Sequence, residues 1–456
     1  RIVAVTNEWD GKYEDCTSEL ITISKVPSSS LPQKTYITLG TQGLSWDTQE
    51  FIVKFNRNSN QYRIQVNDYS EYNTDDDYSA GLTKLTTEIM AGNVPDILDL
   101  SGFSVSQLAG KGLIADLDSF FDSDPDLNKS DFIPNVLAAF EVDGKLYSTV
   151  SNFNIQGVAG ASSIVGDTPG WTYQQLQDAL AQMPEGCDIF SYSTTSTDVL
   201  SSCLALDMGT LVDWTTGQCN FESQGFIDML KFASQFQNDF NWDNYEYSDD
   251  DDDYNRIAQG KQMLLNTYVS DFSDLPMYDA IFGGSVTYIG YPTSSGTGNM
   301  LNFNNSGYAI SARCENKDAA WQFIRTFFTE DFQKEQYGFP SNINAYNAKL
   351  KEAMTPEYQK DENGNYVLDE NGNKIEVSRG GLGWGDTMIE LYATTQEQAD
   401  KLWELITTTT KVADYSSSIY EIVNEQTPAF FSGQKSAEEV ARLIQNKANI
   451  YVNEQR

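Results

Sequence analysis

The sequence predicts an α/β protein with a parallel sheet and crossover helices, preceded by a short β-hairpin appendage. From residue 35 onward, short apolar strands alternate with amphipathic helical segments, which is typical of parallel strands joined by helices. Residues 1–34 differ, because two alternating segments flank a polar turn and a Pro- and Ser-rich linker follows. A hydrophobic content of 40% and an aromatic content of 12% indicate a folded chain.

The first α/β elements follow one another closely. Residues 35–40 predict a strand, 47–55 a helix and 62–66 a second strand. Residues 75–89 predict a helix that starts at three aspartates, which the helix dipole favours at that end; a metal site is the alternative interpretation. Residues 94–100 predict the next strand. Strand, helix, strand, helix and strand at this spacing favour a parallel sheet.

Later segments continue the same alternation. Residues 172–175 and 436–439 have the pattern of capping boxes, each of which starts a helix. Apolar residues at helical spacing predict further helices over 223–236 and 316–333.

One short sequence occurs twice. DENGN stands at residues 361–365 and again at 369–373, and Asn-Gly favours type I′ turns, so two hairpin turns are expected. A calcium loop is the alternative, although the spacing of the glycine does not fit an EF-hand.

Charge and composition exclude several classes of function. The chain has 66 Asp and Glu against 29 Lys and Arg, a net charge of −37, so it repels nucleic-acid backbones and anionic membranes. It contains no histidine, which excludes Ser-His-Asp and Cys-His catalysis and histidine-ligated zinc or haem.

The composition also favours a secreted or surface-anchored protein. No segment approaches the length of apolar sequence that a membrane span needs, and Arg1 is interpreted as a processed start. The five cysteines lack C-x-x-C spacing, which argues against a zinc or redox motif. One disulfide within residues 187–219 and small buried apolar side chains are the two interpretations of the three cysteines there.

A set of motifs runs in a fixed order along the chain after residue 34. The motifs are residues 89–98 (IMAGNVPDIL), 108–117 (LAGKGLIADL), 142–147 (VDGKLY), 170–176 (GWTYQQL), 258–265 (AQGKQMLL), 306–311 (SGYAIS) and 318–323 (DAAWQF). In this order the chain resembles the extracellular solute-binding proteins of carbohydrate ABC transporters, that is, solute-binding family 1, the maltose-binding-protein-like group. Residues 1–34 and 361–374 lie outside the resemblance.

The resemblance implies a two-lobe, type II periplasmic-binding-protein-like fold with a hinge and an interlobe cleft. By analogy, residues 35–153 and 290–335 form the first lobe, and residues 154–289 and 336–456 form the second. Residues 1–34 are the hairpin appendage and its linker. Closure of the hinge around a ligand follows the pattern of such proteins.

Candidate ligand-binding residues come from positions that match the family's cleft and from residue chemistry. Sugars present apolar C–H faces and a rim of hydroxyls, so aromatic rings, carboxylates and amides suit them. The candidates are Trp46, Tyr72, Asp99, Ser101, Gly102, Asn152, Tyr192, Tyr268, Asp271 and Trp384. The first five follow the carboxyl ends of predicted strands, where ligands sit in α/β sheets. Trp384 is the strongest candidate, because four glycines surround it in GGLGWG.

The resemblance also implies the function and the partners. The expected function is extracellular binding of a neutral oligosaccharide and its delivery to a membrane permease, by a monomer that is not an enzyme, needs no cofactor or metal and binds no nucleic acid. A lipoprotein anchor or secretion fits this role. The alternatives are a peptide-binding or other solute-binding protein, a glycosidase or lyase with a carboxylate pair, and a purely adhesive surface protein.

Overall fold

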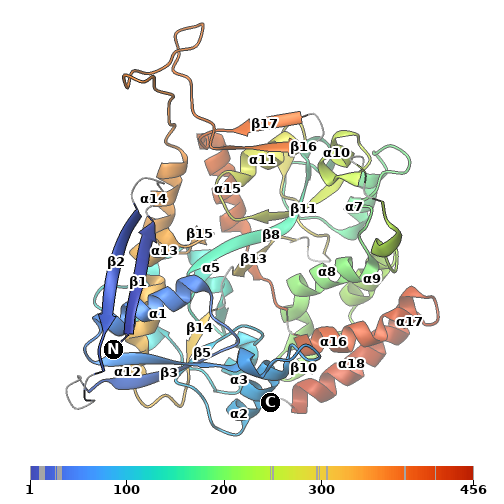
Figure 1. The fold of residues 1–456 in the computed structure, drawn as a ribbon. Coiled ribbons are helices and arrows are strands. Elements are labelled where there is room, and N and C mark those ends of the chain that lie inside the picture. The colour runs from blue at the N-terminus through green and yellow to red at the C-terminus, as the bar shows by residue number, and fades with distance from the viewer. Residues whose placement is uncertain are drawn as a thin grey trace.

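In the computed structural model, the chain forms two lobes that are each built on a sheet, and a separate hairpin precedes them (Figure 1). The structure describes residues 2–9, 16–25, 27, 33–246, 248, 251–293, 296, 298–303, 307–384, 387–415 and 417–454. The hairpin consists of β1 (Ile2–Trp9) and β2 (Cys16–Ile23), which pair antiparallel. The predicted two-lobe α/β fold with a hairpin appendage is confirmed.

The first lobe contains a sheet in the order β14-β5-β3-β4. Its strands are β3 (Thr35–Thr41), β4 (Tyr62–Asp68), β5 (Ile97–Asp99) and β14 (Tyr308–Ile310). β3 runs parallel to β4 and β5, whereas β14 is antiparallel to β5, so the carboxyl ends of β3, β4 and β5 lie at one edge. The surrounding elements are α1 (Trp46–Asn58), η2 (Tyr69–Tyr72), α2 (Ala80–Met90), α3 (Val105–Gly110), α4 (Asp118–Ser123), η3 (Lys129–Asp131), α5 (Pro134–Ala139), β6 (Glu141–Val142), β7 (Lys145–Leu146), α12 (Lys317–Ile324), η6 (Arg325–Phe328) and α13 (Glu330–Glu335).

The second lobe is built around the long strand β8 (Asn152–Ala161). The sheet has the order β11-β8-β13-β18, and β12 and β15 also pair with β8. These strands are β11 (Leu264–Val269), β12 (Val286–Thr287), β13 (Met300–Phe303), β15 (Phe339–Pro340) and β18 (Lys411–Val412).

Helices and small hairpins complete the second lobe. They are α6 (Ser162–Val165), α7 (Tyr173–Leu180), α8 (Ser196–Leu211), β9 (Val212–Asp213), β10 (Gln218–Cys219), α9 (Gln224–Ala233), η4 (Trp242–Asn244), α10 (Asp253–Ala258), α11 (Asp274–Ile281), α14 (Ile343–Ala353), β16 (Gly380–Trp384), β17 (Thr387–Leu391), α15 (Gln396–Thr408), α16 (Ser417–Gln426), α17 (Pro428–Phe431) and α18 (Ala437–Glu454). Helices α8, α9, α16 and α18 pack together in one part of this lobe (Figure 1).

The chain passes between the lobes at the start of β8, between β13 and β14, and ahead of β15. Because β13 pairs with β8 in the second sheet, we propose the return between β13 and β14 as a lobe boundary in place of residue 290. Buried polar side chains hold the crossings together. Asn152 donates from Nδ2 to the carbonyl oxygens of Gln333, at 3.1 Å, and of Gly338, at 3.2 Å, and the Ser341 amide donates to the Ser151 carbonyl at 2.8 Å.

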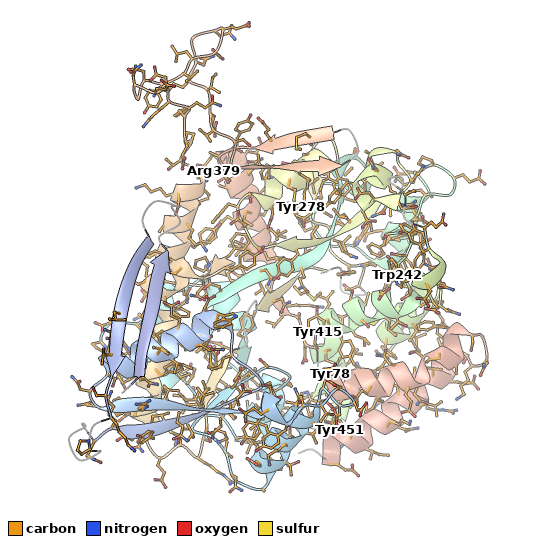
Figure 2. All side chains as sticks on the ribbon, viewed as in Figure 1. Tyr78, Trp242, Tyr278, Arg379, Tyr415 and Tyr451 are labelled. Atoms are coloured by element: carbon orange, nitrogen blue, oxygen red, sulfur yellow. The ribbon has the colours of Figure 1, made fainter. Side chains whose placement is uncertain are left out.

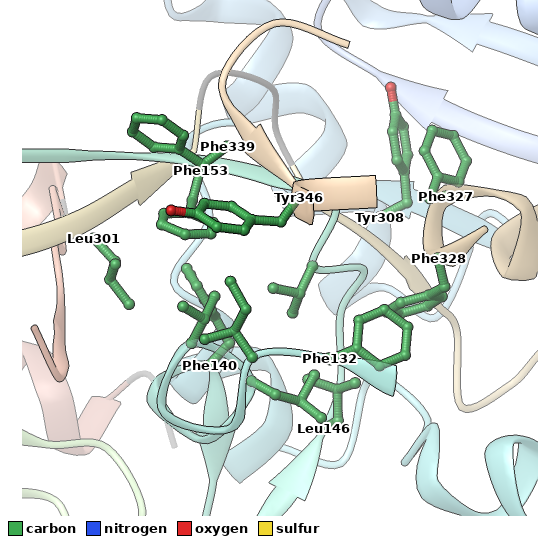
Figure 3. Packing of buried hydrophobic residues seen from close by; sticks show 14 of the residues in the cluster. Phe132, Phe140, Leu146, Phe153, Leu301, Tyr308, Phe327, Phe328, Phe339 and Tyr346 are labelled. Carbon is green, nitrogen blue, oxygen red and sulfur yellow. The ribbon is translucent and has the colours of Figure 1, made fainter. Parts of the chain in front are cut away.

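A hydrophobic core extends from one sheet to the other (Figure 3). In the second lobe, Phe153 of β8 lies 5.9 Å from Phe339 of β15, ring centre to ring centre. In the first lobe, Phe132 and Phe328 are 5.7 Å apart. Burying each of these aromatic side chains stabilises the folded state by roughly 1.5–3 kcal/mol.

Several predicted elements differ in detail from the structure. The predicted helix at residue 75 begins only at Ala80, because Asp77 accepts hydrogen bonds from the backbone and hydroxyl of Ser79 in a preceding turn. The predicted helix 316–333 is divided into α12, η6 and α13. The capping boxes at residues 172–175 and 436–439 are confirmed.

The repeated DENGN segments form turns on a protrusion between α14 and β16 (Figure 1). The expected turns are confirmed, but type I′ is wrong, because that turn needs positive φ at both central residues and only the glycine has it, with φ of 81° at Gly364. Asp361 closes its turn by accepting the amides of Asn363 and Asn365 at 2.9 and 2.8 Å. Asp369 does the same in the second turn.

The structure also decides two questions left by the sequence, the state of the cysteines and the character of the helices. Cys187, Cys203, Cys219 and Cys314 are free, which excludes the disulfide within residues 187–219. In the part of the chain that the structure describes, no helix is both long and apolar enough to cross a membrane.

Two helical glycines lead to opposite predictions. A Cβ at Gly81 in α2 would lie 2.2 Å from the backbone oxygen of Tyr69, whereas a Cβ at Gly209 in α8 would meet no atom within 4 Å. We expect Gly81→Ala to lower the free energy of unfolding by about 1–3 kcal/mol. Gly209→Ala, the control, should raise it by about 0.5–1 kcal/mol through helix propensity. Urea unfolding of both variants measures this, and an equal gain in both would contradict the close contact at Gly81.

Candidate functional site

A cavity of about 690 Å³ lies between the two lobes. The first lobe contributes the loop of residues 100–106, which follows β5, and residues 139–142 at the end of α5. The second lobe contributes Leu206, Gly209 and Thr210 of α8, Asn302 of β13 and residues 411–415, which begin at β18. Because both lobes form its walls, any change in the angle between the lobes changes the shape of this cavity.

The first-lobe wall is organised by a buried carboxylate. Asp99, which is 3% exposed, accepts at Oδ2 from the Thr41 hydroxyl at 2.7 Å and at Oδ1 from the amide and hydroxyl of Ser101, at 3.0 and 2.7 Å. These bonds lock the loop at the carboxyl end of β5. Gly102 follows with φ of 78°, and a Cβ there would come within 2.9 Å of Leu82. The loop therefore packs closely against Leu82 of α2, and its residues Ser101 and Gly102 line the cavity.

A row of polar side chains lies on one face of the second-lobe sheet and reaches the cavity wall. Side chains alternate along a strand, so Asn154 and Gln156 of β8 share one face, and the register places Tyr268 of β11 beside Gln156 and Asn302 of β13 beside Asn154. Asn154 donates from Nδ2 to the Tyr268 hydroxyl at 2.8 Å. Tyr415, which lines the cavity together with Asn302, donates to Gln156 Oε1 at 2.9 Å. Amides and phenols thus form a row on this face of the sheet, and two of them, Asn302 and Tyr415, line the cavity.

The charges near the cavity are largely paired within the protein. Lys411 Nζ lies 2.5 Å from Asp207 Oδ1, and Lys129 Nζ lies 3.0 Å from Glu141 Oε1. Partial burial raises the pKa of both Tyr268 and Tyr415, so these phenols stay protonated at neutral pH. Such a site suits hydrogen bonding to a neutral polar ligand. Among the described residues, no group of His, Cys, Asp or Glu is arranged to hold a metal ion.

The first-lobe candidates lie along one sheet edge. Trp46 is the first residue of α1 after β3, Tyr72 ends η2 after β4, and Ser101 follows β5. Ser101 and Gly102 line the cavity. Trp46 and Tyr72 stand outside it, with exposed fractions of 85% and 51%.

The second-lobe candidates are more scattered. Tyr268 accepts from Asn154 in the row of polar side chains and does not itself line the cavity. Asn152 is buried at the lobe crossing, and Asp271 accepts from the Ser273 amide beside the start of α11. Tyr192 lies in an aromatic cluster beside Phe240, at 5.5 Å. Trp384 ends β16, whose hairpin lies beside α11 and α15, away from the first lobe (Figure 1); its side chain lies outside the described part of the structure.

The sequence analysis missed Asn154, Gln156 and Tyr415. A local signal existed for the first two, because Asn-Phe-Asn-Ile-Gln at residues 152–156 alternates polar and apolar side chains. No local signal distinguishes Tyr415, because its partner Gln156 is 259 residues away in the sequence.

Comparisons with known proteins agree on the fold. The profile of the family described as "Bacterial extracellular solute-binding protein" matches residues 50–364. The sugar-binding protein MalE from Xanthomonas citri has a similar structure, with a TM-score of 0.57 and 12% identity over 92% of this chain and 98% of that chain. An extracellular solute-binding protein of family 1 from Alicyclobacillus acidocaldarius has a TM-score of 0.50 and 15% identity over 92% and 98%.

A third similar structure is the cyclic α-maltosyl-1,6-maltose binding protein from Arthrobacter globiformis. Its TM-score is 0.50, with 13% identity over 92% of this chain and 100% of that chain. A sequence comparison with curated proteins found no match. Because the family profile covers more than half of its residues, the chain belongs to the bacterial extracellular solute-binding proteins.

Proposed function

We propose that this protein binds a neutral oligosaccharide outside the cell in the interlobe cavity and delivers it to the permease of an ABC transporter. The observation that carries the proposal is a cavity enclosed by both lobes, with Asn302 and Tyr415 in its wall. These two residues belong to a row of amide and phenol groups that also contains Asn154, Gln156 and Tyr268. Amides supply both donors and acceptors, and this matches hydroxyl groups, which also do both.

Charge pairing supports a neutral ligand. An anion would have to enter a protein with a net charge of −37, and the lysine in the cavity wall already contacts Asp207. The exposed rings of Trp46 and Tyr72, at the same edge of the first-lobe sheet as the cavity loop, would stack on the C–H faces of a sugar when the lobes close.

The remaining parts of the function follow from the family. We propose a monomer that binds its ligand without altering it, needs no cofactor and is held at the cell surface as a lipoprotein or secreted. Similarity to the MalE protein of X. citri, which is sugar-binding, supports the choice of carbohydrate among possible solutes.

Thermal unfolding in the presence of a glycan panel tests the proposal. A ligand that binds only the native state at 100 times its Kd stabilises it by about 2.7 kcal/mol, so one series of neutral oligosaccharides should raise the melting temperature. Thr210→Trp, which places a large ring on an exposed cavity position of α8, should abolish that increase and leave the unliganded protein folded. An increase with peptides and with no glycan would instead identify a peptide-binding protein.

We expect the same oligosaccharide to compact the protein. Closing the lobes brings the first-lobe loop toward Asn302 and Tyr415 on the opposite wall, so the radius of gyration measured by small-angle X-ray scattering should fall on saturation. Thr210→Trp should show no such change with the glycan. An unchanged radius for a wild-type protein that demonstrably binds the glycan would contradict closure around the ligand.

A further inference from the structure

The second lobe contains another cavity, of about 360 Å³, that lies apart from the first lobe. Its walls come from residues 193–195, the amino-terminal half of α8, the loop of residues 239–242, Asn266 of β11 and Tyr291. Tyr291 donates to Asn266 Oδ1 at 2.9 Å, which fixes that amide at the cavity wall.

An aromatic cluster holds one wall of this second cavity. Tyr192 and Tyr245 stack with ring centres 5.3 Å apart at 27°, and Phe240 meets the edge of Trp242 at 4.7 Å. Gln237 donates from Nε2 to the Tyr192 carbonyl at 2.7 Å and ties the loop to its neighbour. Trp242, although part of this cluster, remains 65% exposed, toward the outer side of the second lobe in Figure 2. These contacts hold the loop against its neighbours and place an indole ring at the cavity wall.

The two cavities lie along one face of α8. Asp198 and Ser202 line the second cavity, and Leu206, Gly209 and Thr210 line the interlobe cavity. These positions recur about every four residues, so they share a helix face. Ser202 and Leu206 are about 6 Å apart along the axis, and the whole row spans about 18 Å, which is longer than a single sugar ring.

The sheet connects the same two cavities. Asn266, in the second cavity, lies two residues before Tyr268 on β11, so both side chains are on the same face of the sheet. Tyr268 lies beside Gln156, which accepts from Tyr415 of the interlobe cavity. Helix and sheet thus both extend without interruption from one cavity to the other.

We propose that the second cavity is a distal subsite that selects long oligosaccharides, with Trp242 as the stacking platform for the outermost rings. This inference rests on the proposed function. The indole covers the apolar face of a ring, while the Asp239 carboxylate and the Ser202 hydroxyl offer acceptors to ring hydroxyls. Asp198 is excluded from this role, because its Oδ2 accepts from the amide and hydroxyl of Thr195 in the capping box of α8.

Calorimetric titration with length series tests this subsite. The probes are α-1,4-gluco-, β-1,4-manno- and β-1,4-xylo-oligosaccharides, from disaccharide to hexasaccharide, against the full chain and against Trp242→Ala. For the series that binds, we expect affinity to rise with length in the wild type. Trp242→Ala should lose about tenfold in affinity for the longest member and keep the wild-type affinity for the disaccharide.

Two control variants make the result specific. Trp403→Ala removes another partly exposed tryptophan, 39% exposed, on α15, and should leave every affinity unchanged. Trp242→Phe should restore most of the dependence on length. Equal losses for short and long members, or wild-type affinities in Trp242→Ala, would overturn the distal subsite and leave the proposed function intact. A wild type that binds none of the series overturns this inference, and if the broader glycan panel also gives no thermal shift, the proposed function fails as well.

Discussion

Replacing Tyr268 with alanine is expected to weaken glycan binding by about 1–3 kcal/mol, the loss that accompanies removal of an aromatic anchor from a binding site. Tyr268 is 40% exposed on the sheet face that carries Asn302 of the interlobe cavity, and its hydroxyl accepts from Asn154. The substitution removes a ring face that packs against a sugar and leaves the Asn154 amide without that partner. Calorimetry with the oligosaccharide identified by the glycan panel measures the loss.

Two further variants serve as controls. One distinguishes the contribution of the Tyr268 ring from that of its hydroxyl, and the other removes an exposed tyrosine far from the cavity. Tyr268→Phe keeps the ring and should lose less affinity than Tyr268→Ala. Tyr36→Ala removes a 59% exposed tyrosine near the amino end of β3, at the opposite end of that strand from the cavity loop, and should bind as the wild type does. Wild-type affinity in Tyr268→Ala, with an unchanged melting temperature, would remove this residue from the site.

Asp124→Asn is expected to lower the free energy of unfolding by about 3 kcal/mol at pH 7, because it breaks a buried ion pair. Asp124 has a side chain that is 3% exposed and accepts from Arg325 Nε and Nη2 at 2.7 and 2.8 Å and from Trp321 Nε1 at 2.9 Å. The variant leaves the Arg325 charge with Asp126 as its remaining partner, at 3.1 Å. Asp126→Asn is the matched control, since that carboxylate is 74% exposed, and it should cost less than about 1 kcal/mol.

The effect of Asp124→Asn should depend on pH in a defined direction. Hydrogen bonds from Arg325 lower the pKa of Asp124 from 3.8 to about 2 in the folded protein. A lowered pKa means that the carboxylate stabilises the fold above its unfolded pKa and loses that contribution as the pH falls toward the folded pKa. Urea unfolding of both proteins should therefore show a constant difference from pH 7 to pH 5 and a shrinking one below pH 4. A difference that stays constant down to pH 3 would contradict the ion pair as its source.

Sequence alone was sufficient for features that depend on neighbours along the chain. The capping boxes at residues 172–175 and 436–439 formed as expected, because the groups that bond are three residues apart. Strands β3, β4 and β5 of the first lobe were predicted from short apolar runs, whereas β14 was not. The predicted helix 316–333 did not form as one piece, because its apolar pattern does not report the local backbone change at η6.

The site was predictable only in part, and the first lobe more fully than the second. Ser101 was chosen as a candidate because it follows a strand, and strand ends in a parallel sheet meet at one edge; it lies in the cavity wall, and its contact with a ligand stays a prediction. Asp99 was expected to contact the ligand, yet its oxygens hold Thr41 and Ser101, which residue chemistry alone does not reveal. The glycines around Trp384 suggested a binding position, and the structure places its hairpin beside α11.

By itself, the sequence determined the alternation of strands and helices, the family, the exclusion of histidine-based chemistry and the acidic surface. Only the tertiary structure decided which polar residues face the cavity. On β8, Asn154, Gln156 and Val158 point to the same side, yet Val158 is fully buried in the core of the second lobe, whereas Gln156 contacts a residue of the cavity wall. That difference depends on where helices far along the chain cover the sheet, and such long-range packing leaves no periodic signal in the strand that it covers.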